Sequence, residues 1–388
     1  MDPAPNNLTA EHRWLRRFCY LVIVATFTLI AIGGKVTSFE YGMAIPEGFT
    51  TGGWLSFLAP LKYWFNDTDK FWEHTHRIKG TVVGFLTIAM TIWLWRSQKH
   101  RPWLKWSGLV MLLLVISQGI MGALRVSEIS LTLAFVHGIV GQLILCSWVV
   151  VAAALSKPWL HRIRSIKQAK RDHATATLRW AVRVLLVLLI AQLTLGSAVR
   201  HFKADKAIPD FPLVYDGFLP PVSQASLDQA YVDYYASNLS SADAESAKAN
   251  GLISNRSPQG EIVVTLSDVY LQYAHRLGAV VVCLLGFYII ASLLLRIEKR
   301  SIVLAPALIV LTLFIGQFAL GVITVFTGTD PLMATLHQAT GAVLIASATW
   351  LAVRIHLAEY PAQPVRSDEK QANPAPAAAP ASVTPVTA

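Results

Sequence analysis

The chain has 388 residues, of which 54% are hydrophobic and only 14% are charged, and its mean hydropathy is +0.48. These values exclude an ordinary soluble domain. They predict a membrane protein with helical spans, because lipid offers no partners to unpaired backbone groups. The net charge of +10 could point to nucleic acid, but the basic residues gather in short segments between apolar stretches. We therefore expect a topology signal and no nucleic-acid binding.

Hydropathy predicts eight transmembrane helices, each long enough for the roughly 20 residues that cross a bilayer. They are expected at residues 17–37, 73–95, 104–125, 130–155, 178–200, 268–295, 302–326 and 331–356. Basic clusters precede the first helix and follow the second, fourth and sixth helices, whereas the alternate connections carry few basic residues. By the positive-inside rule, both termini are cytoplasmic. The short N-terminus lacks a targeting presequence, which favours a bacterial plasma (inner) membrane.

A glutamine followed four residues later by a glycine occurs in three of the helices and indicates an internal repeat. These segments are Gln118–Gly122, Gln192–Gly196 and Gln317–Gly321, and we expect them to serve close helix packing. The predicted fold class is an all-α polytopic membrane protein with two four-helix-bundle repeats. The repeats are parallel because each has an even number of spans.

The repeat also sets the expected domain organisation. The N-terminal half occupies 17–156, and the C-terminal half occupies 178–357 and includes an outer loop at 201–267. The parts outside the halves are a cytoplasmic N-terminus at 1–16, a basic cytoplasmic linker at 157–177 and a disordered Pro/Ala-rich tail at 358–388. Within the outer loop, residues 261–266 fit either a strand or the entry into the sixth helix.

Four histidines form two matched pairs inside these apolar helices. His76 and His137 are 61 residues apart, and His275 and His337 are 62 apart. Each lies about two turns, or ~10 Å, from the outer end of its helix. Ionisable groups in a bilayer are costly and usually functional, and two facing imidazoles can clamp a haem iron. Zinc fits less well, because no cysteine or carboxylate cluster accompanies the pairs.

The two halves differ beside the first histidine of each pair. Glu73 precedes His76 by three residues, whereas Gln272 stands at the matching place before His275. An acid near one metal site favours chemistry there and electron storage at the other site. The alternative is that Glu73 caps its helix. His74 is an alternative ligand to His76.

Arginines follow the first histidine of each pair. Arg77 and Arg276 are candidates for contacts with haem propionates, and an interfacial snorkelling role is the alternative. Arg125 and Arg200, near the outer ends of their helices, are weaker propionate candidates.

Taken together, the helices, the four histidines and the segment from Glu73 to Arg77 resemble the haem A synthase family of cytochrome oxidase assembly. The resemblance implies oxidation of the C8 methyl of haem O to a formyl group. It implies that His76 and His137 are iron ligands of the substrate haem O or haem A, and that Glu73 is the acidic residue beside it. His275 and His337 would be iron ligands of a haem B that relays electrons.

The resemblance also implies partners: membrane lipid, haem O synthase, and cytochrome oxidase subunit I or its assembly factors. The electron donor stays unidentified, and a homo-oligomer is left open. One departure is that residues 38–72 contain no cysteine, whereas many bacterial members carry a pair there. This absence excludes a thiol step at that loop.

Three other functions fit parts of the pattern. A membrane dihaem b-type cytochrome would explain the histidines but not the difference between Glu73 and Gln272. A carrier would bind haem O and release it unchanged. A transporter built on parallel repeats fits poorly, because the helices lack broken segments around a central polar site.

Overall fold

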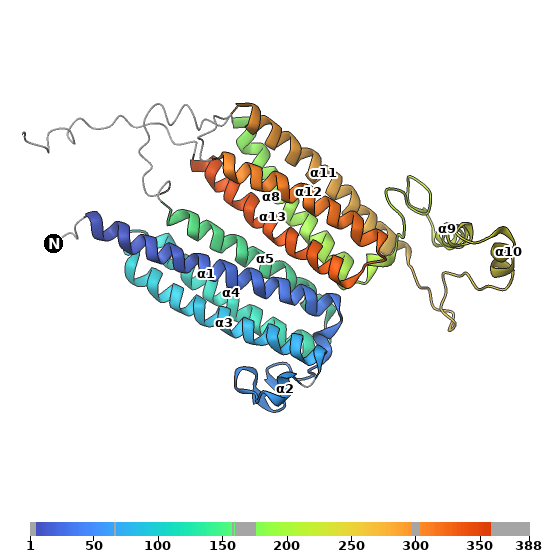
Figure 1. Ribbon diagram of the computed structural model, residues 1–388, viewed down its shortest axis with the longest axis horizontal. Coiled ribbons are helices and arrows are strands. Elements are labelled where there is room, and N and C mark those ends of the chain that lie inside the picture. The colour runs from blue at the N-terminus through green and yellow to red at the C-terminus, as the bar shows by residue number, and fades with distance from the viewer. Residues whose placement is uncertain (1–4, 66, 157–158, 160–175, 297–302, 358–388) are drawn as a thin grey trace, which may run out of the picture.

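The computed structural model describes residues 5–65, 67–156, 159, 176–296 and 303–357. The predicted tail at 358–388 and nearly all of the linker at 157–177 lie outside the described residues. The described part of the chain is almost entirely helical (Figure 1).

Eight of the described helices are long and apolar enough to cross a membrane, and they confirm the predicted spans. They are α1 (Pro5–Ser38), α3 (Thr68–Ser97), α4 (Pro102–Ser127), α5 (Leu131–Ala154), α8 (Ala176–His201), α11 (Leu266–Arg296), α12 (Leu304–Phe326) and α13 (Pro331–Leu357). Most extend a few residues beyond the hydropathic limits. The largest difference is at α1, which begins at Pro5 although its membrane-spanning part begins at Arg13.

Local signals explain where several of these helices begin. The side chain of Asp67 accepts a hydrogen bond from the Asp69 backbone N–H and caps α3. Ser130 caps α5 in the same way. Proline, whose missing N–H costs nothing in a first turn, begins α4 at Pro102 and α13 at Pro331.

The long helices form two four-helix bundles. In the first bundle, α3 and α5 are diagonal, because each packs on both α1 and α4; in the second, α11 and α13 each pack on α8 and α12. Each bundle has its own apolar core, around Trp148 in the first and Ile289 in the second. The bundles meet where α13 packs on α1 and α5, and where α5 packs on α8 (Figure 1).

Long connections join α1 to α3 and α8 to α11 at the same end of the bundles, here called the loop end. The first connection contains a 3-10 turn (Tyr41–Met43), a hairpin of β1 (Thr50–Thr51) and β2 (Trp54–Leu55), another 3-10 turn (Ser56–Leu58) and α2 (Lys62–Phe65). This connection is called the first loop.

The second connection forms a small lobe with its own core. It contains a 3-10 turn (Ala204–Lys206) and two helices, α9 (Gln224–Ser237) and α10 (Ser241–Ala249). Leu227 and Val264 are buried in its core with Tyr215. Residues 261–265 form an isolated bridge, from Ile262 to Arg256, and no strand. The segment leads directly into α11 at Leu266, so of the two alternatives it is the entry into the sixth spanning helix.

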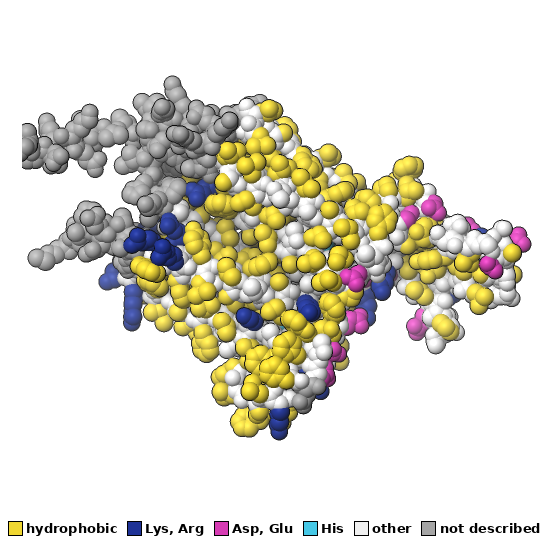
Figure 2. Space-filling model, viewed as in Figure 1, with side chains coloured by type: hydrophobic (Ala, Val, Ile, Leu, Met, Phe, Trp, Pro, Cys, Tyr) yellow, Lys and Arg dark blue, Asp and Glu magenta, His cyan; other side chains and the backbone are white. Residues whose placement is uncertain are grey.

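The surface of the bundles suits lipid. Figure 2 shows apolar side chains spread over the helices, with a dense group of Lys and Arg at the end opposite the loops and further basic side chains at the loop end. Acidic side chains gather at the loop end and on the α9–α10 lobe. Large side chains such as Phe85 on α3 are 63% exposed, which is stable in a bilayer and costly in water.

Candidate functional site

The structure brings the four histidines together in the two pairs predicted from their spacing. His76 on α3 and His137 on α5 lie near each other across the first bundle. His275 on α11 and His337 on α13 are neighbours in the same way across the second. Because each pair joins diagonal helices, its imidazoles converge on the bundle interior from opposite sides. This is the arrangement that a macrocycle clamped by two axial ligands requires.

A glycine on the neighbouring helix forms a cradle for each ring. A Cβ added at Gly33 or Gly196 would lie 2.8 Å from the Cε1 atom of His76 or His275, respectively. A Cβ added at Gly122 would lie 3.3 Å from Cε1 of His137, and one at Gly321 would lie 3.0 Å from Cε1 of His337. A side chain at Gly33 or Gly196 would displace the ring, and one at Gly122 or Gly321 would press on it.

Three of the cradle glycines belong to the glutamine–glycine repeat, which therefore does more than pack helices. The Gln192 amide lies 3.0 Å from Nδ1 of His275. The Gln317 amide lies 3.3 Å from Nε2 of His337. Sequence reasoning missed the fourth cradle, Gly33. Leu29 occupies the place that glutamine takes in the other three helices.

The buried polar atoms fit two haems. The Nδ1 atoms of His76, His137 and His337 are buried, and each of these residues lies beside a backbone carbonyl of the neighbouring helix, that of Leu29, Gln118 and Gln317, respectively. Each of these histidines still keeps part of its surface accessible. No cluster of three or more His, Cys, Asp or Glu side chains that could hold a metal ion occurs in the described part of the chain. Two imidazoles are too few for a protein-held zinc ion, but they suffice for haem, whose macrocycle supplies the other four nitrogens.

Glu73 is almost completely buried and fastens the first loop to α3. One carboxylate oxygen accepts a hydrogen bond from the Ile45 backbone N–H at 2.8 Å. The other pairs with Arg77 Nη2 at 2.7 Å. Arg77 in turn donates to four loop carbonyls, those of Ile45, Glu47, Gly48 and Thr50.

The second bundle repeats this clamp with an amide. The Gln272 side chain accepts from the Ile208 backbone N–H at 2.6 Å and donates to the Asp205 carbonyl at 3.0 Å. Arg276 donates to three carbonyls of the second connection, those of Ile208, Asp210 and Leu213. Both arginines thus hold loop backbone in this structure, and their contact with propionates stays a prediction.

His74 points into the first loop. Its Nδ1 lies 3.3 Å from the Thr51 hydroxyl, and its ring meets Trp64 edge-on at 5.3 Å. These contacts give His74 a structural role in holding the loop, while His76 is the residue that lies near His137.

Two further side chains lie beside the first histidine pair. The Arg125 guanidinium, on α4, acts electrostatically on His76, His137 and Glu73. His201, at the end of α8, lies at the contact between the bundles. Its Nε2 is 3.7 Å from a Cβ added at Gly138. Neither residue has a counterpart in the other bundle, because Thr324 and Ser38 occupy the repeat-related positions.

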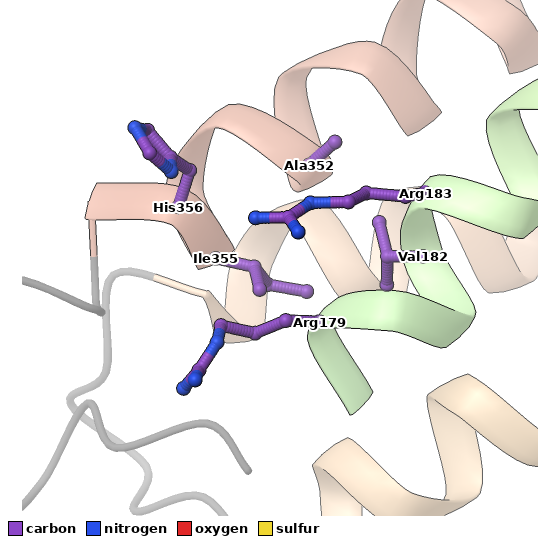
Figure 3. A pocket seen from close by; sticks show the side chains of 6 residues that line it. All are labelled: Arg179, Val182, Arg183, Ala352, Ile355 and His356. Carbon is purple, nitrogen blue, oxygen red and sulfur yellow. The ribbon is translucent and has the colours of Figure 1, made fainter. Parts of the chain in front are cut away.

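A small pocket lies at the other end of the second bundle, between the start of α8 and the end of α13 (Figure 3). Arg179, Arg183 and His356 contribute its polar lining. The histidine pairs lie near the loop end, so this pocket is separate from the candidate site.

Comparison with known proteins gives consistent results. Residues 58–349 match the family described as cytochrome oxidase assembly protein. A haem A synthase of Novosphingobium aromaticivorans is 24% identical over 378 residues, which cover 90% of this chain and 97% of the relative. A haem A synthase of Rhizorhabdus wittichii is 23% identical, covering 90% and 94%. Another, from Beijerinckia indica, is 26% identical, covering 58% and 71%. The chain belongs to the haem A synthase family of cytochrome oxidase assembly proteins.

Proposed function

We propose that this protein is a haem A synthase that oxidises the C8 methyl of haem O to a formyl group, with haem O bound in the first bundle and haem B in the second. The observation that carries the proposal is the pair of glycine-cradled bis-histidine sites in a chain of this family. The oxidation–reduction chemistry is that of the haem iron.

In the first bundle, His76 and His137 hold and orient the substrate. The glycine cradles at Gly33 and Gly122 give each ring a defined place beside the adjacent helix, from which the two histidines would hold the haem. Arg125 adds positive charge beside the pair and suits the carboxylates of the macrocycle. Arg77 and Arg276 are the proposed propionate contacts, in addition to the loop carbonyls that they hold.

Glu73 is the proposed catalytic residue. Its carboxylate lies one helical turn from the His76 ligand, on the same helix face. The negative charge of this carboxylate would stabilise positive charge that develops at the oxidised methyl. Alternatively, the carboxylate would accept and release protons during hydration and dehydration. The same carboxylate holds the first loop at Ile45, so its catalytic and structural contributions must be separated by experiment.

In the second bundle, His275 and His337 would hold haem B as the electron relay. Gln272 replaces the carboxylate there, which agrees with a site that transfers electrons and does not oxidise a methyl group. Glycine cradles and glutamine amides around both rings keep the ligands in place, which suits a site that cycles between redox states without rearrangement.

The membrane context is proposed from the charge pattern. At the end opposite the loops the visible charged side chains are basic, whereas at the loop end basic and acidic side chains are mixed. We therefore place the basic end and both termini in the cytoplasm of a bacterium, with the chain in its inner membrane. Membrane lipid, haem O synthase and cytochrome oxidase subunit I or its assembly factors are the proposed partners.

The decisive experiment is acid-acetone extraction and mass spectrometry of the haems in the purified protein, co-expressed with a source of haem O. Haem B together with haem A or its hydroxylated precursor is the expected result. Haem B alone, despite available haem O, would favour an electron-transfer cytochrome. Unchanged haem O would indicate a carrier.

A further inference from the structure

The first loop exposes a dense set of large apolar side chains. Between Phe49 and Phe65, seven such residues are each about half exposed or more: Phe49, Trp54, Leu55, Phe57, Leu58, Leu61 and Phe65. In the sequence from Tyr41 to Phe65, only Glu47 and Lys62 are charged. A water-facing loop of this composition would be costly, so its environment needs an explanation.

The loop does not project away from the bundle but turns back along α3. The Trp64 indole N–H donates to the Thr75 hydroxyl at 3.0 Å. The Trp64 ring stacks on the Phe71 ring, with 6.4 Å between the ring centroids. Phe65 also contacts Phe71, at 5.8 Å. These partners lie in the first two turns of a membrane-spanning helix. The loop is therefore packed against the loop-end turns of that helix.

Its conformation is fixed by backbone geometry. Gly52 and Gly53 both have positive φ, 60° and 81°, which gives the tight turn between β1 and β2. A Cβ at Gly52 would lie 2.6 Å from the Tyr63 ring, so this glycine also lets α2 pack beneath the hairpin. The apolar face is thus presented by a folded element, which the Arg77 guanidinium ties to α3 through four carbonyls.

The second connection provides a contrast. The α9–α10 lobe extends away from the bundle ends (Figure 1), and acidic side chains are scattered over it (Figure 2). The first loop, at α2, instead forms an apolar patch with a single basic tip beside the helical bundle (Figure 2).

We propose that the exposed face of the first loop lies in the membrane surface itself, with its aromatic and leucine side chains among the lipid headgroups and upper acyl chains. Trp and Phe at this depth are typical of interfacial anchors, which bury about 5–10 Å into the boundary region. Lys62 at the edge of the patch would reach lipid phosphates. The loop then fixes the height of α3, and with it the height of His76, relative to the bilayer.

The test places a spin label at single introduced cysteines in the full-length protein in lipid nanodiscs. Leu58→Cys and Leu61→Cys report on the loop, Phe85→Cys on α3 calibrates lipid, and Leu252→Cys on the lobe calibrates water. All four positions are well exposed, at 59%, 65%, 63% and 76%. Labelled parent protein gives the background from Cys19, Cys146 and Cys283. Accessibility to oxygen, which concentrates in lipid, is compared with accessibility to a water-soluble nickel chelate.

We expect the labels at Leu58 and Leu61 to favour oxygen, with ratios closer to that at Phe85 than to that at Leu252. Ratios equal to the Leu252 value at both loop positions would overturn the proposal and leave the patch facing water. Low accessibility to both reagents would also overturn it, because a protein surface would then cover the patch. Two loop positions are used so that one poorly folded variant does not decide the result.

Discussion

Replacing Glu73 by glutamine separates its two contributions, because the chain already contains the matched case. Gln272 accepts the equivalent loop N–H, so an amide at position 73 can still hold Ile45. What Glu73→Gln removes is the negative charge and the bond to Arg77. Glu73 and Arg77 are 4% and 12% exposed, and a hydrogen bond to a charged group contributes about 1.5–3 kcal/mol. A protein of ordinary stability, about 5–15 kcal/mol, survives that loss.

The effect on turnover should be larger. General acid–base catalysis contributes about 10²–10⁴-fold, which corresponds to about 2.7–5.4 kcal/mol at about 1.36 kcal/mol per tenfold. We therefore expect Glu73→Gln to retain both haems while conversion of haem O to haem A falls by about 100-fold or more. The assay is the haem A to haem O ratio in extracts, normalised to total bound haem, over time after oxygen is admitted.

The control is Gln272→Glu, which alters charge at the repeat-related position and should leave conversion within a small factor of the parent. A Glu73→Gln protein that binds both haems and forms haem A at the parent rate would refute any catalytic role for this carboxylate. A variant that loses haem would instead assign Glu73 to the loop clamp.

Further predictions concern the second histidine pair, a cradle and the lobe. His275→Ala should lose haem B yet keep haem O unconverted; extraction that still yields parental haem B would contradict the assignment. Gly33→Ala should cost about 1–3 kcal/mol by overpacking and lower haem occupancy of the first bundle, whereas Gly119→Ala, with nothing within 4 Å, should not. A pyridine haemochrome assay of the two glycine variants measures their haem occupancy. Tyr215 donates to the Ala207 carbonyl, and burial raises its pKa, so lobe stability should fall as pH rises above about 10. Tyr215→Phe should reduce that loss, as read by hydrogen exchange.

Much of the fold could be predicted because it depends on composition summed over long windows. Each spanning helix is apolar along its whole length, so its existence does not depend on tertiary detail. The helices of the lobe, α9 and α10, escaped prediction because their sequences are polar and lack apolar periodicity. Their start signals were nevertheless present: Ser223 caps α9, and Ser240 caps α10 with Asp243 in its first turn.

The site was predictable to the level of its ligands but not of their surroundings. The histidine spacing survives in the structure because it reflects a repeated helix pair. The partners of Arg77 are backbone carbonyls of a loop, and no sequence pattern reveals which side chain a carbonyl will meet. The cradle at Gly33 depends on a close approach between α1 and α3, which only the packed bundle defines.

The join between the bundles has a consequence for how the two halves became different. The Arg200 guanidinium donates to the Thr37 carbonyl at 3.1 Å, and these residues have the same separation as Gly33 and Gly196, so they are counterparts in the repeat. The two bundles are related by an approximate twofold axis, and counterparts that touch must lie close to it. In a dimer of two identical chains, a residue at that place would contact its own copy in the partner chain. Arg200 also pairs with Asp205 at 3.3 Å, so a dimer of identical halves would have to place two copies of this ion pair in the same small space. A single chain with two unequal halves can keep one cation at the axis, and with it a permanent distinction between two otherwise similar haem sites.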